Sequence, residues 1–137
     1  TNDSMGAYVA ERVVSLLAKK GVAIDQAKVL ILGFAFKPNC PDLRNTKVVD
    51  VHRSLQSKGA KVEIYDPLVD AQSAQTEYGI ALLDELTTLG YQAVILGVGH
   101  DEFAHLNPST FRNKESGEQV FYDVSGVWPY EDIDERL

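Results

Sequence analysis

The sequence predicts one three-layer α/β domain, with a mostly parallel sheet and helices on both faces. Three observations lead to this fold class. Short runs of consecutive apolar residues, typical of strands covered on both faces, alternate with segments of helical periodicity. The chain has 137 residues, of which 45% are hydrophobic, so one domain with a substantial core is expected. No internal repeat, low-complexity tract or linker divides it.

The first helix is expected over residues 3–21. Asp3 or Ser4 can cap its start, and Gly21 can close its end. Residues 1–27 would form this leading helix and a connector, followed by an α/β core at 28–137. The apolar residues of the helix recur at spacings of three and four and therefore share one face: Met5, Val9, Val13, Leu16 and Leu17.

Strands and helices then alternate to the end of the chain. The run from Val29 to Leu32 lacks polar residues, which favours a strand buried on both faces, and Pro67 stops the next strand. Residues 80–82 fit either a short strand or an extended link, and 114–118 form a polar turn. The remaining elements are strands at 27–36, 60–67, 91–100 and 119–126, helices at 46–58, 69–79 and 107–113, and one or two helical turns at 84–90.

Composition excludes several classes of protein. The formal net charge of −7 argues against a dominant nucleic-acid surface, but one or two placed cations would suffice for a small phosphorylated ligand. Cys40 is the only cysteine, so no internal disulfide can form and a reducing, cytoplasmic compartment is expected. No apolar stretch approaches the roughly 20 residues of a membrane span. The start "TNDSMGAYV", without an initiator methionine, suggests a piece of a longer protein.

The stretch "ILGFAFKPNCPDLRNT", residues 31–46, holds the main candidate site. It follows the first predicted strand, and open parallel sheets bind ligands beyond the carboxyl ends of their strands. Gly33 is followed by Phe34 and Ala35, so the glycine pattern of a dinucleotide fingerprint fails, as does that of a Walker loop. Any ligand must therefore be held by side chains more than by a glycine-rich turn.

The side chains of this loop suit a phosphorylated ligand. Lys37 can reach a phosphate as a point charge, and Phe36 can stack on a base or sugar ring. Arg44 can bind a phosphate through two parallel hydrogen bonds, while Pro38 and Pro41 restrict the loop. The alternative is a rigid connection that carries only a surface ion pair between Arg44 and the nearby aspartate.

Other residues offer weaker candidates. Asp66 ends the second strand, where dinucleotide folds keep a ribose-binding acid, but an Asp-Pro pair more often starts a turn. Cys40 is either a nucleophile or a loop cysteine without a role, and no histidine lies near it in sequence. His100 can contact a ligand at its strand end, and Asp101 can cap a short helix. His100, Asp101 and Glu102 lack the spacing of a metal site, and the other two histidines are distant in sequence, so no metal is predicted.

A family resemblance rests on three segments. They are "LGFAFKPNCPDLRNTKVVDV", "GAKVEIYDP" and "AVILGVGHDEF", within residues 29–126. Together they resemble the C-terminal UDP-binding domain of the UDP-glucose/GDP-mannose dehydrogenase family. The "NCPDLRNT" version is most similar to members that act on UDP-N-acetylhexosamines, for bacterial surface polysaccharides.

The resemblance implies a Rossmann-like fold and a longer enzyme. An N-terminal domain would bind most of the NAD, a central helical region would mediate homo-oligomer formation, and this domain would bind the UDP-sugar. The family oxidises the sugar C6 alcohol to a carboxylate in two NAD-dependent steps, through a thioester on a cysteine. That cysteine and its assisting residues are expected upstream, and Cys40 is not the equivalent residue. The chain alone should then have no dehydrogenase activity.

The resemblance also implies binding roles for three residues, each matched to the family pattern by its position. Phe36 and Lys37 match the pair that contacts the UDP-sugar, and Arg44 matches an arginine that reaches NAD. No catalytic residue and no metal ligand is expected in this chain, nor a nucleic-acid or membrane partner.

The chain also departs from the family pattern. Cys40 stands where many UDP-glucose members have threonine, and Ser125 or Gly126 stands where some members have a basic residue that touches the substrate. Two other functions stay open: a stand-alone Rossmann-like nucleotide-binding module without catalysis, and a small hydrolase that uses Cys40.

Overall fold

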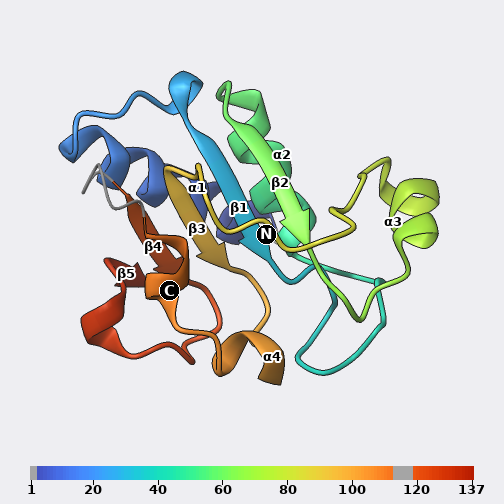
Figure 1. Ribbon diagram of the computed structural model, residues 1–137. Coiled ribbons are helices and arrows are strands. Elements are labelled where there is room, and N and C mark those ends of the chain that lie inside the picture. Colours follow the sequence, from blue (N-terminus) through green and yellow to red (C-terminus); the bar gives the residue numbers. More distant parts are fainter. Residues whose placement is uncertain (1–2, 113–118) are drawn as a thin grey trace.

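The protein is built around a parallel five-stranded sheet (Figure 1). The computed structural model describes residues 3–112 and 119–137. The strands are paired in the order β2-β1-β3-β4-β5, and every pairing is parallel. The predicted fold class is therefore confirmed. The strands are β1 (Lys28–Leu32), β2 (Lys61–Tyr65), β3 (Ala93–Leu96), β4 (Val120–Asp123) and β5 (Glu135–Arg136).

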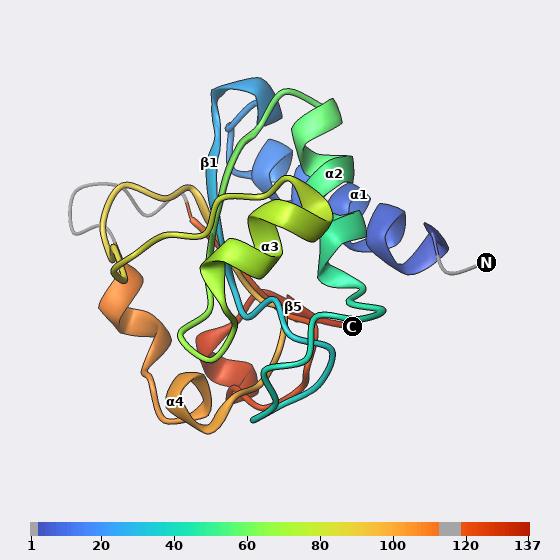
Figure 2. The same ribbon diagram turned by 90° about the vertical axis from the view of Figure 1, so that its right-hand side faces the viewer.

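Helices cover both faces of the sheet. Figure 2 views it nearly edge-on, with α1 and α2 on one side and α4 on the other. The helix α3 lies beyond the β2 edge (Figure 1). The α-helices are α1 (Asp3–Lys19), α2 (Val48–Ser57), α3 (Ala71–Tyr78) and α4 (Asp101–Ala104), and the 3-10 turns are η1 (Ile24–Gln26), η2 (Pro108–Phe111) and η3 (Tyr130–Asp132).

Alternate residues of the strands fill two separate cores. Val29 and Ile31 of β1 face α1 and α2, whereas Leu30 and Leu32 face the layer that contains α4. All four residues of β3 are buried. This two-sided burial explains the unbroken apolar runs, because neither face of a central parallel strand meets water. The second core also holds Tyr91, Phe103, Phe111, Phe121 and Trp128.

The first helix packs closely on the domain. A Cβ atom built on Gly6 would lie 2.5 Å from the Cβ of Asp50, so this glycine lets α1 approach α2. At the other end of the sheet, Arg12 donates two hydrogen bonds to Glu135, at 2.8 and 2.6 Å, and this pair joins α1 to β5. The side chains of Asp3 and Ser4, the predicted caps of this helix, lie outside the described part of the chain.

One prediction of secondary structure needs correction, and one open alternative is decided. Residues 84–90 form no helix. The segment is only seven residues long and contains Thr87 and Thr88, whose branched side chains lower helix propensity. Residues 80–82 are an extended link without strand pairing, and Leu83 N then bonds Ile64 O at 2.8 Å. The two-residue strand β5 was not predicted, because so short a segment has no readable periodicity. The expected turn at 114–118 lies outside the described residues.

Candidate functional site

The loop after β1 begins at a close crossing of two chain segments. Gly33 has a φ of +95°, and a Cβ atom on it would lie 2.6 Å from the Cβ of Val98, which follows β3. Its N–H donates to Tyr65 O at 2.9 Å. Only glycine meets both requirements, the positive φ and the missing side chain. Gly33 therefore allows two segments of the chain to pass close to each other. It differs in this from the glycines of a dinucleotide fingerprint, which form a phosphate-binding turn.

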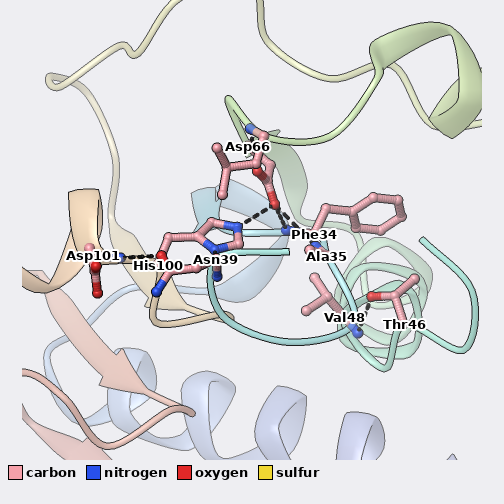
Figure 3. Close-up of polar contacts among 9 residues, drawn as sticks. Phe34, Ala35, Asn39, Thr46, Val48, Asp66, His100 and Asp101 are labelled. Carbon is pink, nitrogen blue, oxygen red and sulfur yellow. Dashed lines mark hydrogen bonds and ion pairs between the residues drawn. The ribbon is translucent and has the colours of Figure 1, made fainter. Parts of the chain in front are cut away.

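Asp66, just past β2, organises the start of that loop (Figure 3). One carboxylate oxygen, Oδ2, accepts hydrogen bonds from Phe34 N at 2.7 Å and Ala35 N at 3.1 Å. The other oxygen, Oδ1, accepts from Leu68 N at 2.9 Å. The last bond confirms the predicted turn. The side chain is fully buried, so it does not face a ribose in this structure.

His100 joins Asp66 to the far end of the same loop. Its Nε2 lies 2.9 Å from Asp66 Oδ2, and its Nδ1 accepts a hydrogen bond from Asn39 N at 2.8 Å (Figure 3). Because Nδ1 accepts, the ring proton must sit on Nε2, which donates to the carboxylate. The ring is fully buried, so it makes no direct ligand contact here. The helix α4 does begin at Asp101, but Asn39 Oδ1 supplies its cap by accepting from Asp101 N at 2.9 Å.

A cavity of about 250 Å³ opens across the carboxyl ends of β1, β3 and β4. This edge is where parallel sheets bind ligands. Phe36 contributes an aromatic wall, Ser125 a hydroxyl group, and Lys47 the only charge among the lining residues. Lys47 directly precedes α2 and is exposed. The lining residues are Met5, Ala35, Phe36, Lys47, Val48, Gly97, Val98, Val124 and Ser125.

A second buried carboxylate fixes the turn that carries Ser125, one of the residues that line this cavity. Asp123, the last residue of β4, accepts hydrogen bonds through Oδ1 from Ser125 N at 2.9 Å and Gly126 N at 2.8 Å. Its Oδ2 accepts from Trp128 N at 2.7 Å. These bonds fix the turn that presents Ser125 to the cavity. Sequence reasoning missed both Asp123 and Lys47, although an acid at a strand end and a lysine at a helix start were visible signals.

The structure separates the three predicted binding residues. Phe36 lines the cavity, with 49% of the residue exposed, and Lys37 is exposed beside it on the loop. Arg44 instead lines a different cavity of about 250 Å³, which includes the carboxylates of Asp70 and Glu77. Phe36 therefore lines the edge cavity with Lys37 next to it in the sequence, whereas Arg44 lines another cavity.

Arg44 is held by Asp42 through a bidentate ion pair. The guanidinium nitrogens Nε and Nη2 lie 3.1 and 2.9 Å from the carboxylate oxygens. Hydrogen bonds from the Arg44 side chain, then from its backbone N–H, lower the pKa of Asp42 to about 2, and the pair raises the pKa of Arg44. The arginine side chain is nevertheless 83% exposed. The predicted surface pair is present, and it leaves one side of the guanidinium open to a ligand.

Cys40 gains no partner for nucleophilic chemistry from this loop. Both ring nitrogens of His100 already make hydrogen bonds, so this imidazole cannot act as its base. Within 3–112 and 119–137, no group of three or more potential ligands could hold a metal ion. No helix in those ranges is long and apolar enough to cross a bilayer.

The parallel sheet with its edge cavity places the chain among Rossmann-like α/β domains that bind ligands at the carboxyl ends of their strands. The family described as "UDP-glucose/GDP-mannose dehydrogenase family, UDP binding domain" matches residues 30–130. The chain belongs to this family.

Curated relatives agree with that assignment. UDP-N-acetyl-D-glucosamine 6-dehydrogenase of Salmonella typhi is 43% identical over 99% of this chain and 32% of its own length. The protein of the same description from Pseudomonas aeruginosa is 40% identical, with the same coverage. Protein CapL of Staphylococcus aureus is 32% identical over 92% of this chain and 30% of its length. The chain thus spans about a third of the relatives that it matches.

Solved structures share the fold. The NDP-N-acetyl-D-galactosaminuronic acid dehydrogenase of Methanosarcina mazei superposes with a TM-score of 0.81 at 24% identity, over 95% of this chain and 27% of that one. The UDP-N-acetyl-mannosamine dehydrogenase Cap5O of Staphylococcus aureus gives 0.73 at 22% identity, over 97% and 30%. At these identities the likeness concerns the fold alone.

Proposed function

We propose that this chain is the UDP-sugar-binding part of a longer NAD-dependent nucleotide-sugar 6-dehydrogenase. The substrate would be a UDP-N-acetylhexosamine, which the enzyme oxidises to the uronic acid for surface polysaccharide synthesis. The two relatives at 43% and 40% identity, both described as UDP-N-acetyl-D-glucosamine 6-dehydrogenases, support this substrate class. The catalytic cysteine would lie in the preceding part of the longer protein, a cytoplasmic homo-oligomer.

The observation that carries this proposal is the cavity between Phe36 and Lys47 at the carboxyl edge of the sheet. Phe36 offers an apolar wall for the uracil or sugar ring, while Lys47 and the neighbouring Lys37 offer positive charge to the diphosphate. The cavity volume of about 250 Å³ is below the roughly 300–1,000 Å³ of pockets that enclose drug-sized ligands. A UDP-sugar would therefore extend beyond this chain, toward the catalytic part of the enzyme.

Lys47 can also replace the basic residue that some family members have after the strand equivalent to β4 and that this chain lacks. Ser125 or Gly126 stands in that place, and Ser125 lines the same cavity as Lys47. A cation from the start of α2 can thus make the substrate contact that, in some members of the family, a basic residue after β4 is expected to make. The short Asp123-bound turn leaves room for this, because Ser125 is small.

NAD supplies the hydride acceptor for the two oxidations. In this chain, the residue that fits NAD is Arg44, whose exposed guanidinium can bind a phosphate while Asp42 fixes its orientation. The adjacent cavity contains Asp70 and Glu77 and would repel a phosphate. We therefore expect the cofactor to meet the outer side of Arg44, presented by another domain.

Calorimetric titration of the full-length protein tests the proposal. Saturable UDP binding is expected, and Lys37→Ala should weaken it by about 10- to 100-fold, because one charge-assisted hydrogen bond to a phosphate contributes about 1.5–3 kcal/mol. NAD is titrated in parallel. Binding of NAD without any binding of UDP would overturn the substrate assignment and favour a stand-alone nucleotide-binding module.

A further inference from the structure

The buried pair formed by Asp66 and His100 has no direct part in the proposed binding. Both side chains are fully buried, with Nε2 of the histidine 2.9 Å from the carboxylate. The other ring nitrogen accepts from Asn39 N. With both nitrogens occupied and no exposed edge, His100 can neither transfer a proton to a substrate nor touch one. The remaining role is a structural one, and the hydrogen bonds of the pair indicate what it is.

The pair holds both ends of one short loop segment (Figure 3). Ala35 N donates to Asp66 Oδ2 at 3.1 Å, and Asn39 N donates to His100 Nδ1 at 2.8 Å. Only three residues, 36–38, lie between these anchors, and they include Phe36 and Lys37. The two residues expected to contact the UDP-sugar thus lie between two anchors that belong to one buried, hydrogen-bonded Asp66–His100 pair.

The segment also contains one left-handed residue and a third backbone hydrogen bond. Asn39 adopts a φ of +58°, a left-handed conformation that most residues avoid. Phe36 N also donates to Asp42 O at 2.8 Å, which ties this segment to the one that carries Arg44. Loss of the bond from Asn39 N to His100 would leave the bonds of Ala35 N, Phe36 N and Asn39 Oδ1 intact, but it would remove a buried anchor next to Lys37 and loosen residues 37–39.

We propose that His100 is a positioning residue for UDP-sugar binding: with Asp66 it clamps residues 35–39 and so preorganises Phe36 and Lys37. This inference rests on the proposed function. A preorganised loop binds more tightly because less conformational freedom is lost on binding. We expect loss of the clamp to weaken UDP binding on the order of tenfold.

Two conservative variants of the full-length enzyme each remove one of the two hydrogen bonds that His100 makes, the bond from Asn39 N or the bond to Asp66. The amide of asparagine mimics Nδ1 of histidine, and that of glutamine mimics Nε2. His100→Asn therefore keeps the acceptor for Asn39 N, whereas His100→Gln keeps the donor to Asp66 and loses that acceptor. The calorimetric Kd for UDP should rise about tenfold in His100→Gln and clearly less in His100→Asn. In steady-state kinetics, KM for the UDP-sugar should rise in His100→Gln with kcat retained.

A stability control accompanies these variants. Leu17→Ala removes a fully buried side chain at the end of α1 remote from Met5 and the cavity. It should lower the melting temperature and leave the Kd for UDP unchanged, so weaker binding cannot be ascribed to lost stability alone. Equal Kd values for wild type and a folded His100→Gln would overturn the clamp, as would equal losses in the two His100 variants.

A measurement on the wild-type enzyme covers the case in which neither variant folds. The backbone amide of Asn39 should exchange with solvent slowly, and still more slowly with UDP bound. Rapid exchange in the UDP-bound enzyme would overturn the clamp. Absence of UDP binding by wild type is a different outcome, because it overturns the proposed function and this inference together.

Discussion

Asp66 Oδ2 and His100 Nε2 lie 2.9 Å apart although their strands, β2 and β3, are not neighbours. The strand β1 lies between them in the sheet. The contact therefore passes over the carboxyl end of β1, where the chain enters the candidate site. Asp66 also accepts the N–H groups of Phe34 and Ala35 at that end. One buried carboxylate thus connects the chain segments that follow the three adjacent strands β2, β1 and β3.

Replacement of this carboxylate should destabilise the fold. Asp66→Asn keeps one acceptor oxygen where the structure uses two, so at least one of the buried N–H groups loses its partner. The free energy of unfolding, measured in a denaturant titration, should fall by about 3 kcal/mol. Asp70→Asn provides the matched control: Asp70 caps the exposed end of α3, and asparagine caps helices equally well. A loss below about 1 kcal/mol for Asp66→Asn would contradict this account.

Gly33 should tolerate no side chain. In Gly33→Ala, the alanine would have to adopt a φ of +95°, and its Cβ atom would lie 2.6 Å from that of Val98. Gly90→Ala meets a similar φ of +93°, with no atom within 4 Å of the new Cβ. The backbone conformation alone costs about 1–2 kcal/mol, and overpacking adds about 1–3 kcal/mol. Thermal unfolding should therefore show a clearly larger loss for Gly33→Ala than for Gly90→Ala, and equal losses would refute the close crossing.

Local sequence signals predicted the elements of this fold where one pattern dominated. The unbroken apolar run from Val29 to Leu32 indicated a central parallel strand, and the structure buries it on both faces. Residues 84–90 were wrongly predicted as helical, because a few polar and apolar residues imitate one turn of an amphipathic helix. The strand β5 escaped prediction since its pairing with β4 depends on tertiary contacts.

The candidate site was predictable in place but only partly in its contacts. The composition of the loop pointed to Phe36, which lines the cavity. The contact between Asp66 and His100 could not be predicted from the sequence. The two residues are 34 positions apart, and only the strand order brings them together. Lys47 was overlooked for a similar reason, since the cavity exists only once β1, β3 and β4 align.

The Asp42–Arg44 pair predicts an unusual titration. Hydrogen bonds from Arg44 lower the pKa of Asp42 from its ordinary 3.8 to about 2. A depressed carboxyl pKa stabilises the folded state above the unfolded pKa, and that contribution is lost as the pH falls from about 4 through 2. The pair should thus persist at neutral pH and orient Arg44. In NMR titration, the Asp42 carboxyl should show a midpoint near 2, and Arg44→Gln should return it toward 3.8. A wild-type midpoint near 3.8 would show that the pair does not persist in solution.

Lys47 should contribute to UDP binding through its charge. Among the described residues, it is the only charged one that lines the cavity; it precedes α2, whereas Lys58 caps the opposite end of the same helix. Lys47→Met keeps most of the aliphatic side chain and removes the ammonium group, so UDP affinity in the full-length protein should fall on the order of tenfold. Lys58→Met changes the net charge equally and should leave the affinity unchanged.

The salt dependence distinguishes a phosphate contact at Lys47 from a change in cavity shape. If the ammonium group meets the diphosphate, the effect of Lys47→Met on the Kd should shrink as ionic strength rises, because salt screens partly exposed charges. A loss that is constant with salt would indicate altered packing instead. Equal affinities of wild type and Lys47→Met at low salt would remove Lys47 from the site. The positive charge at the diphosphate would then have to come from Lys37 or from the rest of the enzyme.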